Sequence, residues 1–189
     1  MILSQFQAVG RDLFARGLVS SSSGNLSIRM GERIIITRRG SMLNCLNEHD
    51  LIETGVTRNN RATPLASVEL PVHRAIYQKT QALAIVHAHP PHAIALSLAE
   101  REIVPSSLEG IHAIGTIPVL GWDMEIKAGG LADIIAEALT RQKIVLVHGH
   151  GTFAIGQLIE EAYNLTTALE ETCHVLCLLR SFPKKTTKR

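Results

Sequence analysis

Two short aliphatic runs constrain the fold of this 189-residue chain more than any other feature. Residues 83–87 and 144–147 are apolar and partly β-branched, and polar or glycine-containing segments follow both. Runs of this length and composition are typical of buried strands. Both runs end at or beside a pair of histidines spaced two residues apart, so the sequence predicts imidazoles at the ends of two buried strands.

Helical segments alternate with these strands. We expect helices over residues 1–17, 67–79, 92–99, 129–140 and 159–179, and further strands over residues 25–29, 33–37 and 117–120. Ser67 is a suitable N-cap for the second helix, which places Glu69 in its first turn. The alternation predicts an α/β fold with helices flanking a central sheet. The short strands around polar turns at residues 30–32 and 38–40 favour a mostly antiparallel or mixed sheet.

The composition, 46% hydrophobic and 19% charged, is that of a folded globular domain. Aromatic residues make up only 4%, so aliphatic side chains must fill the core, and the stacking rings of a nucleic-acid surface are scarce. The formal charge of +2 does not suggest a polyanionic partner. We therefore predict one domain over residues 1–181, a solvated basic tail over residues 182–189, and no nucleic-acid partner.

No stretch reaches the roughly 20 apolar residues of a membrane span, and the first helix lacks the apolar core of a signal peptide. Three cysteines form no disulfide framework, which favours the reducing cytoplasm. Cys173 and Cys177 lie four residues apart near His174 on a predicted helix. They fit either a buried apolar face or a metal site without an evident fourth ligand. We expect a cytoplasmic protein with no membrane partner.

Residues 86–90, with the sequence Val-His-Ala-His-Pro, carry the sharpest chemical signal. Residues two apart in an extended chain point to the same face, so His87 and His89 present two imidazoles side by side. This pair suits a tetrahedral metal such as zinc, although two core histidines explain the spacing equally well. Residues 148–151, His-Gly-His-Gly, follow the second aliphatic run, and they fit either a close backbone approach to a ligand or a surface turn.

Glu69 adds a carboxylate to this set. The helix dipole favours an acidic residue at a helix start, and this accounts for most such glutamates. Together with three histidines, however, Glu69 completes a mixed nitrogen and oxygen set that suits zinc. A carboxylate ligand could also leave the metal and open a coordination position for substrate.

Several polar loops provide hydroxyls, amides and free backbone N–H groups. They comprise residues 22–25, Thr37, Gly40 and Ser67. Near a helix N-terminus, such groups bind a phosphate without any lysine. Arg38 and Arg39 either add charge to this cradle or lie exposed to solvent.

Taken in order, these motifs resemble those of the class II aldolase/adducin family, and most closely its L-fuculose-phosphate aldolase-like members. The motifs are residues 22–29, residues 36–40, Ser67-Val68-Glu69 followed by His73, His87-Ala88-His89, and His150-Gly151. They extend over nearly the whole chain. The resemblance implies the family's α/β fold, one zinc ion per subunit, and a homotetramer with active sites between neighbouring subunits.

The resemblance also assigns residue roles. It makes His87, His89 and His150 metal ligands, and it makes Glu69 alternate between metal ligand and catalytic acid/base. It assigns phosphate binding to Ser22, Asn25, Thr37, Gly40 and Ser67. His148 is expected at the surface or behind the ligands.

Three positions depart from the family pattern. Val68 stands where the aldolases usually have a second phosphate-binding serine, and Arg39 stands where they often have a small hydroxyl residue. A tyrosine from a neighbouring subunit donates a proton in these aldolases, and Glu109 stands at the matching position here. We expect Glu109, or else His112, to supply that proton.

The resemblance implies a zinc-dependent aldolase that cleaves a ketose 1-phosphate, such as L-fuculose 1-phosphate, to dihydroxyacetone phosphate and an aldehyde. Zinc would stabilise an enediolate, and Glu69 would move the proton next to the carbonyl. The departures leave open another metal-enediolate reaction of the family, a methylthioribulose-1-phosphate dehydratase or a pentulose-phosphate 4-epimerase. A third interpretation is a non-enzymatic adducin-like module, but such modules have lost the metal ligands.

Overall fold

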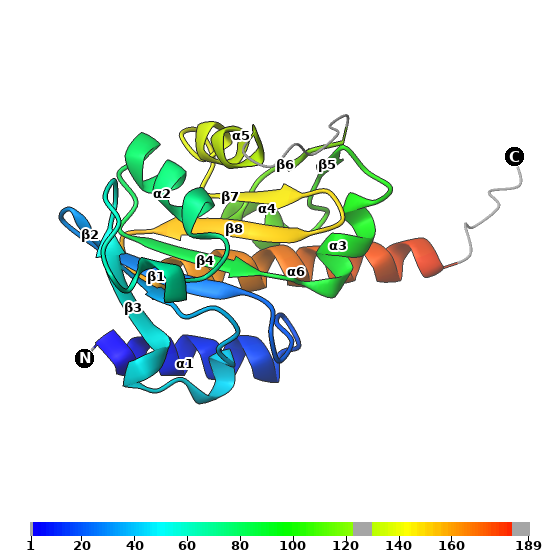
Figure 1. Ribbon diagram of the computed structural model, residues 1–189. Helices are drawn as coiled ribbons and strands as arrows, with labels where there is room; N and C mark the ends of the chain where they lie inside the picture. The colour runs from blue at the N-terminus through cyan, green and yellow to red at the C-terminus, as the bar shows by residue number, and fades with distance from the viewer. Residues whose placement is uncertain (1, 123–129, 183–189) are drawn as a thin grey trace, which may run out of the picture.

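A computed structural model describes residues 2–122 and 130–182, and one eight-stranded sheet organises it (Figure 1). The strands are β1 (Asn25–Met30), β2 (Arg33–Thr37), β3 (Leu51–Gly55), β4 (Ala84–Ala88), β5 (Glu102–Ile103), β6 (Ile117–Leu120), β7 (Ile144–Val147) and β8 (Gly151–Gly156). Their order is β3-β2-β1-β4-β8-β7-β6-β5. All neighbouring pairs are antiparallel except β6 and β7. The predicted α/β fold with a mostly antiparallel sheet is confirmed.

Helices flank both faces of this sheet (Figure 1). The α-helices are α1 (Ile2–Ala15), α2 (Leu70–Lys79), α3 (Pro91–Ser97), α4 (Leu108–Ala113), α5 (Gly130–Ala138) and α6 (Ile159–Ser181). The described residues also form three short 3-10 helices, η1 (Leu43–Cys45), η2 (Glu48–Asp50) and η3 (Thr63–Leu65). One core cluster joins the sheet to α1, α3 and α6, and a second joins it to α2 and α5. The two clusters bury the two faces of the central strands.

Strand β4 shows how the sequence divides between these clusters. Ala84, Val86 and Ala88 belong to the cluster with α1, α3 and α6, whereas Ile85 belongs to the cluster with α2 and α5. Side chains alternate along a strand, so His87 shares the face of Ile85 and points toward α2. All five residues of β4 are buried, which is why the run is almost continuously apolar.

The sequence patterns do not predict three of the strands or one of the helices, and the most consequential of these elements is β8. The segment Gly151–Gly156 has a glycine at each end and only two β-branched residues, so its local pattern does not predict a strand. In the structure, β8 begins one residue after His150 and pairs with both β4 and β7. Strands β3 and β5 and helix α4 were also not predicted.

The prediction that Ser67 caps α2 was wrong. The helix begins at Leu70, and Glu69 occupies the N-cap position. Ser67 instead forms a turn before the helix, in which its Oγ accepts a hydrogen bond from the N–H of Glu69 at 3.3 Å. Pro71 in the first turn fits this start, because proline needs no hydrogen-bond donor there.

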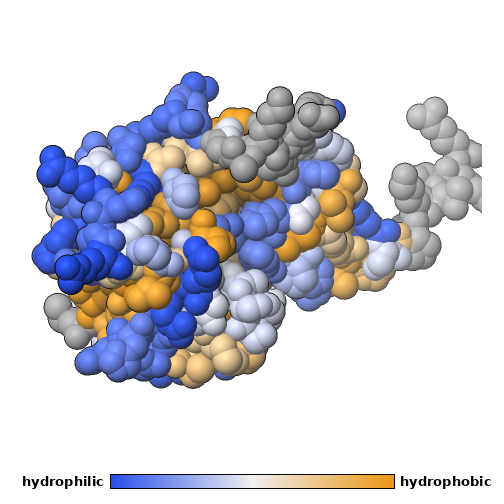
Figure 2. Space-filling view, viewed as in Figure 1, coloured by the Kyte–Doolittle hydropathy of each residue, from blue (hydrophilic) through white to orange (hydrophobic). Residues whose placement is uncertain are grey.

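Polar residues dominate the end of the molecule at β2 and β3, whereas apolar residues are more frequent elsewhere on the same face (Figure 2). No helix in residues 2–122 and 130–182 is long and apolar enough to cross a membrane. Apart from Phe182, the predicted basic tail over residues 182–189 lies outside the described residues. The proposed boundary of the domain at residue 181 therefore stays a prediction.

Candidate metal centre

A cavity of about 380 Å³ lies where the ends of β4 and β7 meet the start of α2. Its lining consists of Ser22, Ser23, Gly24, Asn25, Arg38, Arg39, Gly40, Ser41, Ser67, Val68, Glu69, His87, His89 and His150. All three predicted histidine ligands and Glu69 therefore border one space. These four residues come from three separate parts of the sequence, and the fold brings them together.

His87 is the most firmly held of these residues. Its side chain is 1% exposed, and its ring stacks on Phe153 with 4.2 Å between ring centroids. The Nδ1 atom lies 2.9 Å from the carbonyl oxygen of Thr152 on the neighbouring strand β8. This hydrogen bond requires a proton on Nδ1, so in the neutral ring the Nε2 lone pair points toward the cavity.

His89 and His150 complete a compact group of imidazoles. The Nε2 atoms of His87 and His89 are 2.8 Å apart, and the ring of His150 stacks on that of His87 with 5.0 Å between centroids. One nitrogen from each of the three rings lies within 4.8 Å of the others. Burial and then the nearby charges of His87 and His150 lower the pKa of His89 to about 4, which keeps its ring in the neutral form that binds metals.

The close approach of β4 and β8 sets this spacing. His87 pairs with Phe153 and Ala88 pairs with Thr152, so His150 emerges beside the end of β4. A Cβ atom on Gly151 would lie 2.3 Å from the carbonyl oxygen of Ala88. Glycine is therefore required for the backbone contact that places His150 next to His87.

Glu69 spans two of the histidines. Its Oε1 lies 3.0 Å from Nε2 of His150, and its Oε2 lies 3.0 Å from Nε2 of His87. The Nδ2 amide of Asn25 also donates to Oε2 at 3.0 Å. Burial alone would raise the pKa of Glu69, but the hydrogen bonds from His150, His87 and Asn25 and the charge on His87 hold it well below its usual value. The carboxylate is therefore ionised at neutral pH.

A buried hydrogen-bond network lies beneath Glu69. Ser27 on β1 bonds to Nδ1 of His73 at 2.6 Å and to the hydroxyl of Tyr77 at 2.8 Å. Both partners lie on α2, one and two turns after Glu69. The network fixes α2 against β1, and it therefore helps to hold Glu69 at the cavity.

The donor set fits a divalent metal ion. Three imidazole nitrogens and a carboxylate converge, and unprotonated nitrogens so close to one another need a cation, either a proton or a metal ion, between their lone pairs. Three histidines with an additional oxygen ligand match the coordination that zinc adopts in catalytic sites. Thr152 provides the carbonyl that orients the ring of His87, as is usual behind a metal-binding histidine.

Four of the five predicted phosphate-binding residues line the same cavity. They are Ser22, Asn25, Gly40 and Ser67. The fifth, Thr37, is buried and does not line it, and its hydroxyl accepts a hydrogen bond from the N–H of Leu26 at 3.2 Å. Gly40 has a φ of +71°, a left-handed turn conformation that glycine adopts without strain. The phosphate-binding roles stay a prediction.

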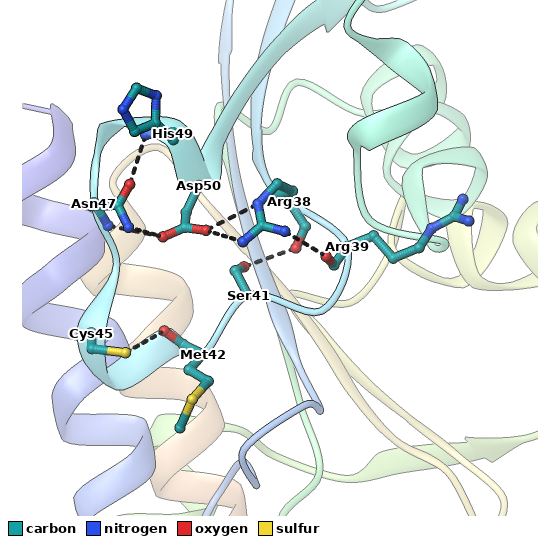
Figure 3. A network of polar contacts seen from close by, with 8 residues as sticks. All are labelled: Arg38, Arg39, Ser41, Met42, Cys45, Asn47, His49 and Asp50. Atoms are coloured by element: carbon teal, nitrogen blue, oxygen red, sulfur yellow. Dashed lines mark hydrogen bonds and ion pairs between the residues drawn. The ribbon is translucent and has the colours of Figure 1, made fainter.

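Ser23, which belongs to the polar loop predicted over residues 22–25, also lines the cavity. Ser41 lines it too and was not singled out from the sequence, and its Oγ donates to the carbonyl of Arg38 at 2.8 Å. Asp50, which bonds to Arg38, lies further along the chain in η2 (Figure 3). Serines and aspartates at turns are common, so no local pattern marks these residues.

Glu109 lies apart from the metal centre within one chain. It is exposed on α4 beside α6, and it borders a different cavity, with Ser107 and Thr172. His112, on the same helix, is also exposed and absent from the metal-centre cavity. A catalytic role for either residue stays a prediction, and it requires a second subunit.

His148 and the cysteines also lie outside the metal-centre cavity. The ring of His148 packs against Trp122 with 4.5 Å between centroids. Cys173 is buried in the core, and burial raises the pKa of its thiol to about 12. The interpretation of Cys173 and Cys177 as a buried apolar face agrees with this placement, since His174 instead stacks on His92.

Comparison with known proteins identifies the family. Residues 4–177 match the family described as Class II Aldolase and Adducin N-terminal domain. The chain therefore belongs to the class II aldolase and adducin family. Within it, the chain stands among the metal-dependent class II aldolases, which are carbon–carbon lyases.

Several relatives align along most of the chain. An L-fuculose phosphate aldolase of Methanocaldococcus jannaschii is 31% identical over 96% of this chain and 98% of its own length. A methylthioribulose-1-phosphate dehydratase of Acidiphilium cryptum is 33% identical over 86% of this chain and 83% of its own length. A probable bifunctional methylthioribose-1-phosphate isomerase/methylthioribulose-1-phosphate dehydratase of Nocardia farcinica is 27% identical to this chain. The chain spans 35% of the length of that protein.

A solved structure supports the same assignment. The crystal structure of L-fuculose-1-phosphate aldolase from Thermus thermophilus superposes with a TM-score of 0.87 at 38% sequence identity. The match covers 94% of each chain. The two proteins therefore share the same overall fold along nearly their whole length.

Proposed function

We propose that this chain is a zinc-dependent aldolase that cleaves a ketose 1-phosphate, such as L-fuculose 1-phosphate, to dihydroxyacetone phosphate and an aldehyde. The observation that carries the proposal is the joining of three imidazoles and Glu69 at a cavity lined by serines and glycines. The choice of substrate is supported by the L-fuculose phosphate aldolases of Methanocaldococcus jannaschii and Thermus thermophilus, which are 31% and 38% identical to this chain. We also propose that the reaction takes place in the cytoplasm.

His87, His89 and His150 would hold the metal ion, and Glu69 would be a ligand that can leave. Bound zinc would supply a Lewis acid that polarises the carbonyl of the substrate. Ser22, Asn25, Gly40 and Ser67, which line the cavity, would position the phosphate, and the buried Thr37 would contribute only indirectly.

Cleavage requires one group that accepts a proton and one that donates a proton, and these define two residue roles. The bond between C3 and C4 breaks, the C4 hydroxyl loses its proton to become an aldehyde, and the electron pair passes to the C2–C3 fragment. Glu69, once it has left the histidines and taken up a proton from solvent, would then deliver that proton to C3, completing dihydroxyacetone phosphate, while the proton taken from the C4 hydroxyl returns to solvent. Glu109 from a neighbouring subunit would accept the proton of the C4 hydroxyl.

Exposed apolar residues on α4 support a shared active site. Leu108 is 71% exposed and Ile111 is 51% exposed, and they lie on either side of Glu109 in the sequence. Burying them against another subunit would be favourable, and it would remove Glu109 from bulk solvent. We therefore propose a homotetramer in which α4 of one subunit approaches the metal centre of the next.

The direct test is cleavage by the purified, zinc-loaded protein. Ketose 1-phosphates would be incubated with the protein, and released dihydroxyacetone phosphate would be measured by its reduction with a coupled dehydrogenase. We expect release from L-fuculose 1-phosphate or a close stereoisomer. If no ketose 1-phosphate yields dihydroxyacetone phosphate, the aldolase proposal is wrong.

The second candidate is dehydration of methylthioribulose 1-phosphate. A specific observation favours it: Glu109 stands in place of the family tyrosine, and a dehydratase is 33% identical to this chain. NMR of the incubated substrate separates the two reactions. Loss of water without carbon–carbon cleavage would select the dehydratase, whereas inversion at C4 of a pentulose phosphate would instead indicate a 4-epimerase.

A further inference from the structure

Two consecutive arginines at the cavity have different environments (Figure 3). Arg38 bonds to Oδ1 of Asp50 through Nη2 at 2.7 Å and through Nε at 3.1 Å. The side chain of Asp50 is only 7% exposed, and its other oxygen is bound by Asn47. The charge of Arg38 is therefore already neutralised within the protein.

The side chain of Arg39 extends away from this network (Figure 3). Its guanidinium forms no hydrogen bond or ion pair with any residue in the described part of the chain, although the side chain lines the metal-centre cavity. Of the two arginines at the cavity, only Arg39 thus has a charge with no acidic partner among residues 2–122 and 130–182.

The backbone explains why the two arginines differ. The N–H of Arg38 donates to the carbonyl of Asp50 at 2.7 Å, whereas the N–H of Arg39 donates to the carbonyl of Leu65 at 2.9 Å. The N–H of Ser67 donates to the carbonyl of Thr37 at 3.1 Å. Arg39 is therefore attached to the segment that leads through Ser67 and Val68 into α2.

Val68 makes this segment poor in side-chain donors. It is 65% exposed and lines the cavity between Ser67 and Glu69, but its side chain has no polar atom. An anion at this edge would receive one hydroxyl from Ser67 and none from its neighbour. Because Val68 offers no donor, an anion at this edge of the cavity would be recognised mainly through the charge of Arg39.

We propose that Arg39 is a specificity-determining residue that binds the phosphoryl group of the substrate and supplies the donors that Val68 lacks. A guanidinium presents paired N–H groups that match two phosphate oxygens, and its charge persists at every physiological pH. This inference rests on the proposed function for the identity of the substrate. It adds that the site requires a phosphorylated substrate through charge, beyond the neutral cradle of hydroxyls and backbone N–H groups.

The test compares 2-phosphoglycolate with glycolate as probes of the full-length, metal-loaded protein. Calorimetry gives the dissociation constant of each, and their ratio isolates the contribution of the phosphoryl group. Arg39→Ala should reduce this ratio about tenfold, as expected for loss of a charged hydrogen-bonded contact, and leave glycolate binding unchanged. Salt should weaken 2-phosphoglycolate binding more in the wild type than in Arg39→Ala.

Three further variants define the effect. Arg61→Ala removes the same charge from an exposed residue outside the cavity, and it should leave the ratio unchanged. Arg39→Lys keeps the charge, so it should lower the ratio of the two dissociation constants less than Arg39→Ala does. Adding Val68→Ser to Arg39→Ala provides a hydroxyl at the same edge, and it should recover part of the loss.

An unchanged ratio in a folded Arg39→Ala protein would overturn the inference, as would an equal loss of glycolate and 2-phosphoglycolate binding. Thermal unfolding of each variant verifies folding, and Arg39→Lys provides the comparison if the alanine variant is unstable. The proposed function is judged separately. If no ketose 1-phosphate is cleaved but the ratio still falls in Arg39→Ala, the aldolase proposal fails and the role of Arg39 stands.

Discussion

The two carboxylate oxygens of Glu69 lie 3.0 Å from Nε2 of His150 and 3.0 Å from Nε2 of His87, and Asn25 donates to Oε2, so the carboxylate is fixed in direction. A carboxylate held in this way is well placed to be a metal ligand. To exchange a proton with substrate, it must first lose some of these contacts. Its two proposed roles are therefore alternatives in time, not simultaneous states.

Glu69→Gln should separate these roles. The amide preserves the shape of the side chain but cannot transfer a proton, so we expect exchange of the proton next to the carbonyl of dihydroxyacetone phosphate to fall by about 10²- to 10⁴-fold. Exchange with deuterated water is followed by NMR. The control is Glu53→Gln on β3, which removes an exposed carboxylate that pairs with Arg33 on β2. This variant should exchange the substrate proton at the wild-type rate. Wild-type exchange in Glu69→Gln would contradict the role.

The two histidines of the His-Gly-His-Gly segment should differ in metal binding. His150 lies within the group of three imidazoles, whereas His148 packs on Trp122. Alanine at position 150 should remove stoichiometric zinc, and alanine at position 148 should retain it. Metal analysis of the dialysed proteins measures both. Equal loss of zinc in the two variants would show that His148 ligates or is essential to the centre.

The cysteines should differ in reactivity. Cys173 is fully buried, and burial raises the pKa of its thiol to about 12, so almost no reactive thiolate exists at pH 8. Cys45 is exposed. We expect iodoacetamide to label Cys45 readily and to leave Cys173 unmodified in the folded protein, as mass spectrometry of the peptides would record. Labelling of Cys173 at a similar rate would contradict its burial, and urea-unfolded protein provides the positive control.

At the scale of elements, the pairing of β4 with β8 matters most for the site. These strands place His87 and the residue after it against Phe153 and Thr152, and the tight turn after β7 brings His150 back to the same edge. The start of α2 brings Glu69 from the other side, supported by the buried bonds of Ser27. The metal centre is therefore sensitive to small movements between these elements.

Two glycine substitutions test this sensitivity. Gly151→Ala would place a Cβ atom 2.3 Å from the carbonyl oxygen of Ala88, and Gly10→Ala would place one 2.2 Å from the carbonyl oxygen of Leu43. Each should lower the free energy of unfolding by about 1–3 kcal/mol through overpacking. Only Gly151→Ala should also weaken zinc binding, because only β8 carries a ligand at its start. Urea unfolding and zinc titration measure the two effects, and equal zinc affinity in both variants would contradict this account.

At the scale of the whole molecule, the two proposed catalytic glutamates are separated. Glu69 lines the metal-centre cavity, whereas Glu109 lies on α4 against α6, where several apolar residues are exposed. A single chain thus presents a metal centre and, elsewhere, a surface that could complete the centre of another chain.

Mixing two inactive variants tests this arrangement. Glu69→Gln and Glu109→Gln subunits should each be inactive alone. After they are dissociated and reassembled together in equal amounts, about a quarter of the shared sites would combine two wild-type glutamates, and a corresponding fraction of the activity should return. The release of dihydroxyacetone phosphate measures it, and each variant reassembled alone is the control. No recovery in verified mixed oligomers would contradict shared sites.

The sequence by itself determined the elements with strong local patterns. The aliphatic run of β4 predicted a buried strand that ends in two histidines on alternate positions, and the hairpin of β1 and β2 followed from its polar turn. These features depend on side-chain alternation and turn chemistry over a few residues. The order of the motifs along the chain also predicted the family, since that order can be recognised without any coordinates.

Only the tertiary structure decided which of these residues meet. β8 carries a weak local pattern, yet it lies between β4 and β7 and brings His150 to His87. The different environments of Arg38 and Arg39 depend on Asp50 and Leu65, which lie more than ten and more than twenty residues further along the chain. Long-range pairing is settled by packing and by satisfied hydrogen bonds across the whole domain, so adjacent residues with similar chemistry can acquire different partners.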